Sequence, residues 1–134
     1  MITPLYAAIF ALLLVAMSLH IIKSRAAHNV GIGDGNNFDL RRRIRAQGNL
    51  TEYAPIFILL LAFAEYNGLP FWAIHIFGLT FLTARLSHAY SLLYAEKYTE
   101  EKLIENPVWR IGGMMMTMGT ISLLAVINLI QVTL

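Results

Sequence analysis

The sequence predicts an all-α membrane protein in which four helices form a single domain over residues 1–134. Composition is the first reason: 57% of the residues are hydrophobic and 13% are charged, whereas a soluble domain is about half apolar and about a quarter charged. The second is a set of four apolar segments at about 4–23, 38–66, 70–94 and 107–132. The third is the clustering of Lys and Arg around two of the connections. The net charge of +2 is too small to indicate a nucleic-acid partner.

The first segment begins at Pro4, which suits the first turn of a helix, and its apolar run extends from Leu5 to Ile22. Its roughly eighteen residues approach the length of about 20 that crosses the hydrocarbon core of a bilayer. No basic region precedes the run and no small-residue cleavage site follows it. We therefore expect a retained transmembrane helix rather than a signal peptide.

Residues 29–37 form a glycine- and asparagine-rich connection that lacks the spacing of a phosphate-binding loop. The second segment opens at Phe38 and Asp39, where an acidic side chain is favourable at the positive end of a helix. Its nearly thirty residues exceed the thickness of a bilayer, so its first half projects beyond the membrane or lines a cavity within it. Pro55 predicts a kink in this helix.

The third segment carries His75, Arg85 and His88, and its last turns are polar and aromatic. A charged loop over residues 95–106 follows it. Pro107 starts the fourth segment, with Arg110 inside the first turn.

Positive charge predicts the orientation of the helices. Lys and Arg flank the first and third connections, whereas the second connection and both ends of the chain have none. The first and third loops are therefore predicted to be cytoplasmic and both termini to lie on the opposite side. This topology places the polar half of the second helix, the polar end of the third and Arg110 at one level near the cytoplasmic face.

A polar stripe at this level is the main candidate site. Arg45, Asn49 and Glu52 are spaced i, i+4 and i+7, which places them on one face of a helix. Ionisable residues in spans are costly and usually face the bundle interior or a wet cavity. Arginines bind carboxylates bidentately and a glutamate accepts from an amine, so the set suits a ligand carrying carboxylates and an ammonium group. The candidates at this level are Arg25, Arg45, Gln47, Asn49, Glu52, Tyr53, Arg85, His88 and Arg110.

Simpler roles are open for several charged residues at this level. The neighbouring arginines Arg41, Arg42 and Arg43 are explained by attraction to lipid headgroups. Arg85 and His88 could form a structural pair, and the only role of Glu52 could be to neutralise a neighbouring arginine.

The chain contains no cysteine, so a disulfide, a thiolate nucleophile and a cysteine metal site are excluded. No pair of histidines has a convincing metal spacing, and the methionines at 114–118 are expected to serve packing and lipid contact.

The segment 45–55, with the sequence Arg-Ala-Gln-Gly-Asn-Leu-Thr-Glu-Tyr-Ala-Pro, resembles the signature of the MAPEG family, the membrane-associated proteins in eicosanoid and glutathione metabolism. Residues 84–88 resemble the second landmark of that family, on the third helix. The loop around Gly33 and Gly35 resembles the corresponding loop in bacterial members of the family rather than that in the eukaryotic enzymes. Some relatives have a tyrosine four residues after the His88 position, where this chain has Leu92.

The resemblance implies a homotrimer in the bacterial inner membrane, with periplasmic termini, that binds glutathione between subunits near the cytoplasmic side. Glutathione would be a co-substrate, and no metal is implied. The function implied is that of a glutathione transferase, or a glutathione-dependent peroxidase, acting on lipophilic electrophiles dissolved in the bilayer. Arg110 is the counterpart of the arginine that stabilises the glutathione thiolate. The implied glutathione-binding residues are Arg25, Arg45, Gln47, Asn49, Glu52, Tyr53, Arg85 and His88.

Two other functions are open to a chain with four apolar segments. A non-catalytic lipid-binding or scaffold protein with the same fold would bind glutathione without turnover. A small multidrug exporter also has four short spans, but such exporters use an acid deep in the first helix, and the first segment here has neither Asp nor Glu.

Overall fold

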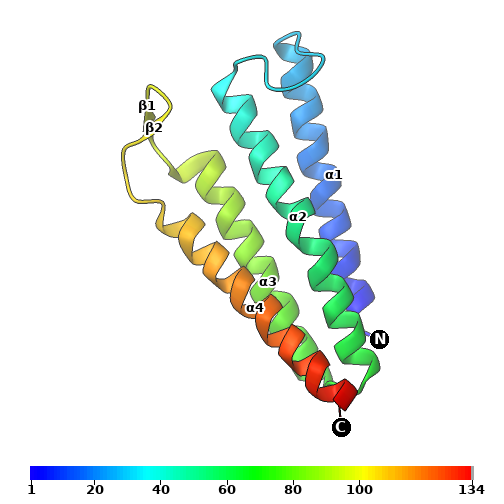
Figure 1. The fold of residues 1–134 in the computed structure, drawn as a ribbon. Helices are drawn as coiled ribbons and strands as arrows, with labels where there is room; N and C mark the ends of the chain where they lie inside the picture. The colour runs from blue at the N-terminus through cyan, green and yellow to red at the C-terminus, as the bar shows by residue number, and fades with distance from the viewer. Residues whose placement is uncertain (134) are drawn as a thin grey trace.

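The computed structural model describes residues 1–133, which form four long helices and a small hairpin (Figure 1). The four helices are α1 (Thr3–Ala27), α2 (Phe38–Tyr66), α3 (Phe71–Tyr90) and α4 (Val108–Thr133). α1 packs mainly on α2 and α3 packs mainly on α4, while α2 also contacts the second pair. Both termini lie at one end of the bundle, and the connections α1–α2 and α3–α4 lie at the other. An all-α four-helix fold is thus confirmed.

The helix boundaries follow the local sequence signals. Pro4 lies in the first turn of α1. Asn37 caps α2, because its side-chain oxygen accepts a hydrogen bond of 2.9 Å from the backbone nitrogen of Leu40. Asp39 lies in the first turn of that helix. α2 continues as an α-helix on both sides of Pro55.

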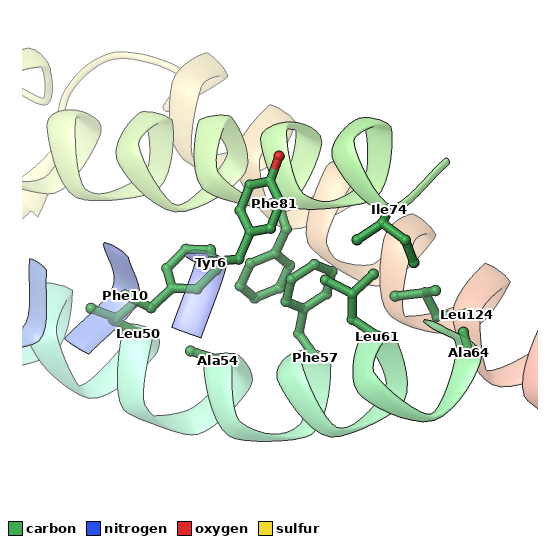
Figure 2. Close-up of a cluster of buried hydrophobic side chains, with 10 residues drawn as sticks. All are labelled: Tyr6, Phe10, Leu50, Ala54, Phe57, Leu61, Ala64, Ile74, Phe81 and Leu124. Atoms are coloured by element: carbon green, nitrogen blue, oxygen red, sulfur yellow. The ribbon is translucent and has the colours of Figure 1, made fainter. Parts of the chain in front are cut away.

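Aromatic side chains form the centre of the core (Figure 2). The rings of Phe57 and Phe81 stack with centroids 3.9 Å apart, and Phe10 packs edge-on against both. Tyr6 is also buried, and its ring occupies the space that the missing side chain of Gly78 leaves. α1, α2 and α3 are therefore joined by aromatic packing at this level.

The connection between α3 and α4 has more structure than the charged loop that the sequence predicted. A turn of π-helix (Ser91–Ala95) extends α3, and the hairpin β1 (Tyr98–Thr99) and β2 (Lys102–Leu103) follows it. The backbone nitrogen of Glu96 donates to the Ser91 oxygen at 3.0 Å, which is the five-residue spacing of a π-turn. Glu100 and Glu101 both have positive φ, as the two central residues of a tight hairpin turn with the favoured twist require.

Length and composition mark α1 and α4 as helices able to cross a membrane. α2 and α3, which the sequence also predicted to span the membrane, do not reach the same apolar length and composition, and the first turns of α2 carry several arginines. Most of α4 also exposes large apolar side chains, including Met115, Leu123, Leu129 and Val132. Such a surface suits contact with lipid or with another apolar partner.

Candidate functional site

The polar stripe of α2 forms as its spacing predicts. Nη1 of Arg45 lies 2.9 Å from Oε1 of Glu52, seven residues further along the helix. Both side chains are more than 40% exposed, at 60% and 47%. Asn49 lies between them in the sequence but is buried. The stripe therefore has an exposed ion pair and a buried amide, which turns toward the other helices.

A cavity of about 540 Å³ opens beside this stripe. It lies in the range of about 300–1,000 Å³ that is usual for small-molecule sites. Its lining comes from α2, α3, the π-turn and α4: Arg45, Asn49, Tyr53, His88, Leu92, Arg110, Ile111, Met114, Met115 and Met118. Five of the nine candidate residues thus line one cavity. Glu52 is joined to it through its ion pair with Arg45.

Arg85 lies behind the cavity, in the interior of the bundle. Its guanidinium group donates hydrogen bonds to Oδ1 of Asn49, to Oγ1 of Thr117 and to the backbone oxygen of Gly113, the last at 3.3 Å. It also lies 5.4 Å from the ring centroid of Tyr53. Arg85 thereby connects α3 to α2 and α4, and it orients two residues of the cavity wall, Asn49 and Tyr53.

Close approach of α3 and α4 brings His88 to the cavity. A side chain at Gly113 would place its Cβ 2.6 Å from the backbone oxygen of Ala84 and 3.2 Å from Cβ of His88. Only glycine permits this approach. Over residues 1–133 the structure places no three potential metal-ligating side chains together.

Arg110 reaches the cavity from the first turn of α4. Its Nη1 atom lies 3.2 Å from Oε2 of Glu96, and its side chain is 33% exposed. The two guanidinium groups of the lining, those of Arg45 and Arg110, are each paired with one carboxylate.

Two candidates lie elsewhere in the single chain. Gln47 donates a 2.6 Å hydrogen bond from Nε2 to Oγ of Ser18, which joins α2 to α1. Arg25 lies in the last turn of α1 and does not line the cavity. A role for either residue in binding glutathione stays a prediction, since it would need a neighbouring subunit or another arrangement of the ligand.

Several residues of the site had no signal in the sequence. Met114, Met115 and Met118 were expected to serve packing and lipid contact, whereas together with Ile111 they form the face of α4 that lines the cavity. Glu96 lies in the connection that the sequence predicted to be a charged loop, yet its side chain is only 2% exposed. The five-residue spacing of Ser91 and Glu96 could have indicated their hydrogen bond only if a π-turn had been expected.

Comparison with known proteins shows the family of the chain. The MAPEG family model matches residues 3–130. The chain is 36% identical over 129 residues to the inner membrane protein YecN of Escherichia coli strain K12. The aligned residues cover 96% of this chain and 91% of YecN. The protein of the same name from Escherichia coli O6:H1 matches to the same extent.

The match of the family model covers nearly the whole chain, and the four helices and the motif at 45–55 lie within it. This protein therefore belongs to the MAPEG family, a family of membrane proteins that includes glutathione transferases.

Proposed function

We propose that this protein is a glutathione-dependent membrane enzyme that conjugates or reduces lipophilic electrophiles. The observation that carries the proposal is the shared cavity of Arg45, Asn49, Tyr53, His88 and Arg110. These residues come from three helices, and the family motif supplies the first three of them.

The lining suits the chemistry of glutathione, a tripeptide with two carboxylates, an ammonium group and a thiol. The guanidinium of Arg45 can bind a carboxylate, and Glu52 beside it can accept from the ammonium group. The ion pair between them would then open to receive a ligand of the same charge pattern. Asn49 and Tyr53 add neutral hydrogen-bonding groups to the same wall.

Arg110 is the residue that we assign to the sulfur. A thiol has a pKa of about 8.5 and is mostly protonated at neutral pH. A guanidinium next to the sulfur stabilises the thiolate, with about 1.4 kcal/mol for each unit by which the pKa falls. In conjugation, the thiolate sulfur forms a bond to the electrophilic carbon, and the leaving group departs with the electron pair of its bond. In peroxide reduction, the sulfur bonds to one peroxide oxygen while the O–O bond breaks, and the other oxygen leaves and is protonated to an alcohol. A second glutathione then attacks the resulting sulfenic acid at sulfur, which forms the disulfide and releases water.

The apolar part of the cavity would receive the electrophile. Ile111 and the three methionines of α4 form that wall, and Met115 is 71% exposed. Methionine is flexible and polarisable and fits apolar molecules of varied shape. A substrate dissolved in the bilayer would reach the sulfur from this side.

The homotrimer is part of the proposal. Arg45 and Glu52 are exposed in the single chain, and charge that faces hydrocarbon is costly. A neighbouring subunit over this face would cover the pair and complete the cavity. We place the trimer in a bacterial inner membrane, with the α1–α2 and α3–α4 connections in the cytoplasm and both termini in the periplasm.

The test uses the purified protein in detergent, glutathione and a generic chloronitroaromatic electrophile. Binding is measured by calorimetry and conjugation by absorbance. We expect Arg45→Ala to weaken glutathione binding, and Arg110→Ala to lower turnover by about tenfold or more with little change in affinity. The matched control is Arg43→Ala, because Arg43 pairs with Asp39 at 3.3 Å and does not line the cavity.

Three results would contradict parts of the proposal. Wild-type turnover in Arg110→Ala would remove Arg110 as the thiolate partner. Glutathione binding without turnover of any electrophile tested would favour the non-catalytic scaffold. Absence of glutathione binding to the wild-type protein would overturn the function itself.

A further inference from the structure

Glu96 is a buried carboxylate next to the cavity, and the proposed mechanism does not use it. Its side chain is 2% exposed and accepts hydrogen bonds from Oγ of Ser91 at 2.8 Å and from the hydroxyl of Tyr98. Its third partner is Nη1 of Arg110, at 3.2 Å. The three partners come from the π-turn, the hairpin and α4, so one carboxylate joins three elements.

A buried carboxylate is costly unless it is paired and hydrogen-bonded. Both oxygens of Glu96 have partners here, with Ser91 on Oε1 and both Tyr98 and Arg110 on Oε2. Burial together with the hydrogen bond to Glu96 raises the pKa of the Tyr98 hydroxyl, which therefore stays protonated and remains a donor. The carboxylate is thus held in one orientation.

The frame around Glu96 is attached to α2. The guanidinium of Arg42 donates to the backbone oxygens of Leu92 and Glu96, the second at 3.5 Å, and lies 5.1 Å from the ring centroid of Tyr98. Arg41 pairs with Glu101 at the tip of the hairpin at 2.7 Å. The arginines at the start of α2 therefore do more than attract headgroups, because two of them anchor the hairpin that carries Tyr98.

We propose that Glu96 is a positioning residue that holds the guanidinium of Arg110 toward the cavity. The proposal rests on the function proposed above, in which Arg110 stabilises the thiolate. Glu96 engages Nη1, and the fork of the guanidinium has further N–H donors that the pairing leaves available to a ligand. Arginine has a long, flexible side chain, so fixing one nitrogen removes most of its rotational freedom.

Loss of the carboxylate should affect turnover more than binding. Arg45, Asn49 and Tyr53 are not among the side-chain partners of Glu96, so their contacts with glutathione would remain. We expect Glu96→Ala to lower kcat by about tenfold, as the loss of one charge-assisted hydrogen bond would. Glutathione affinity should change by less than about twofold. Glu96→Gln keeps an oxygen acceptor but not the charge, and we expect a fall of about threefold.

The matched control is Glu105→Gln. Glu105 is an acid of the same connection, but it is exposed and pairs with Lys97 at 2.9 Å. This variant should have wild-type turnover. Wild-type turnover in Glu96→Ala, or an equal loss of kcat and affinity, would overturn the positioning role. If Glu96→Ala does not fold, Glu96→Gln carries the same comparison.

A second measurement does not depend on activity. An arginine-specific dicarbonyl reagent, followed by peptide mass spectrometry, reports the reaction rate of Arg110. Arg43, which pairs with Asp39 and does not line the cavity, is the internal reference. We expect Glu96→Ala to raise the rate at Arg110 severalfold and to leave Arg43 unchanged. An unchanged rate at Arg110 would overturn the positioning role, whatever the activity. A raised rate in a protein that does not bind glutathione would instead support the contact and contradict the proposed function.

Discussion

Replacing Arg85 with methionine removes the guanidinium that joins three helices while keeping a long, mainly apolar side chain. Arg85 is 3% exposed and donates to Asn49, Thr117 and the Gly113 carbonyl. Oγ1 of Thr117 also donates to the Gly113 carbonyl at 2.8 Å, so the Thr117 hydroxyl and the Gly113 carbonyl stay bonded to each other in the variant. Oδ1 of Asn49 would lose its hydrogen bond from Arg85.

The expected destabilisation follows from the number of bonds. Hydrogen bonds between transmembrane helices contribute about 0.6 kcal/mol on average and up to about 1.7 kcal/mol. Three bonds therefore give about 2–5 kcal/mol. A bond with a charged donor is stronger than a neutral one, which favours the upper half of that range. For a chain of this size, that corresponds to a fall in Tm of roughly 10–20 °C.

The assay is thermal unfolding of the purified protein in detergent, with glutathione affinity as a second readout. We expect the affinity to fall as well, because Arg85 holds Asn49 and lies over the ring of Tyr53 in the cavity wall. Thr117→Val is the graded control, since it removes one of the three acceptors and should cost about 1 kcal/mol. A Tm within about 2 °C of the wild type in Arg85→Met would show that the three bonds contribute no net stability.

Two further predictions concern helix packing and pH. Gly113→Ala should destabilise the protein by about 1–3 kcal/mol in thermal unfolding, because its Cβ would meet the Ala84 oxygen at 2.6 Å. The control Gly112→Ala, whose Cβ meets nothing within 4 Å, should be neutral or stabilising. Equal effects of the two substitutions would contradict the close packing at Gly113. The hydrogen bond from Arg41 holds the pKa of the partly exposed carboxyl of Asp34 below its ordinary value. A lowered folded-state pKa means that this stabilisation is complete above the ordinary value and is lost as the pH falls below it. Amide hydrogen exchange of residues 29–37, corrected for intrinsic rates, should therefore accelerate in the wild type below about pH 4. In Asp34→Asn the corrected exchange rate should not depend on pH. The same pH dependence in both proteins would argue against the contact.

The family and the helices were predictable because their signals are local. Apolar segments, Pro4 and Asp39 mark helix positions within a few residues, and the structure places α1, α2 and α4 close to the predicted ranges. The spacing of Arg45, Asn49 and Glu52 is a property of any helix, so their common face needed no tertiary information. The match over residues 3–130 confirms the family that the motif at 45–55 indicated.

The connection between α3 and α4 was not predictable in the same way. Its hairpin turn uses two glutamates with positive φ, whereas Gly, Asn and Asp are the usual residues there. The π-turn depends on the hydrogen bonds of Glu96 with Ser91, and the hairpin on the contacts of Tyr98 and Arg42. These contacts join residues up to about fifty positions apart, and no periodicity in the sequence reports them.

Four apolar helices, the polar face of α2 and the family could be recognised from the sequence alone. Hydrophobic segments and helical spacing act over a few turns, so they can be recognised in one dimension. Which polar residues meet depends on how the helices pack. Gly113 lets α3 approach α4, which brings His88 and Arg110 to the face of α2 that carries Asn49, while Gln47 turns toward α1. The division arises because a side chain's face on its helix is set locally, whereas its partner depends on how closely the helices pack.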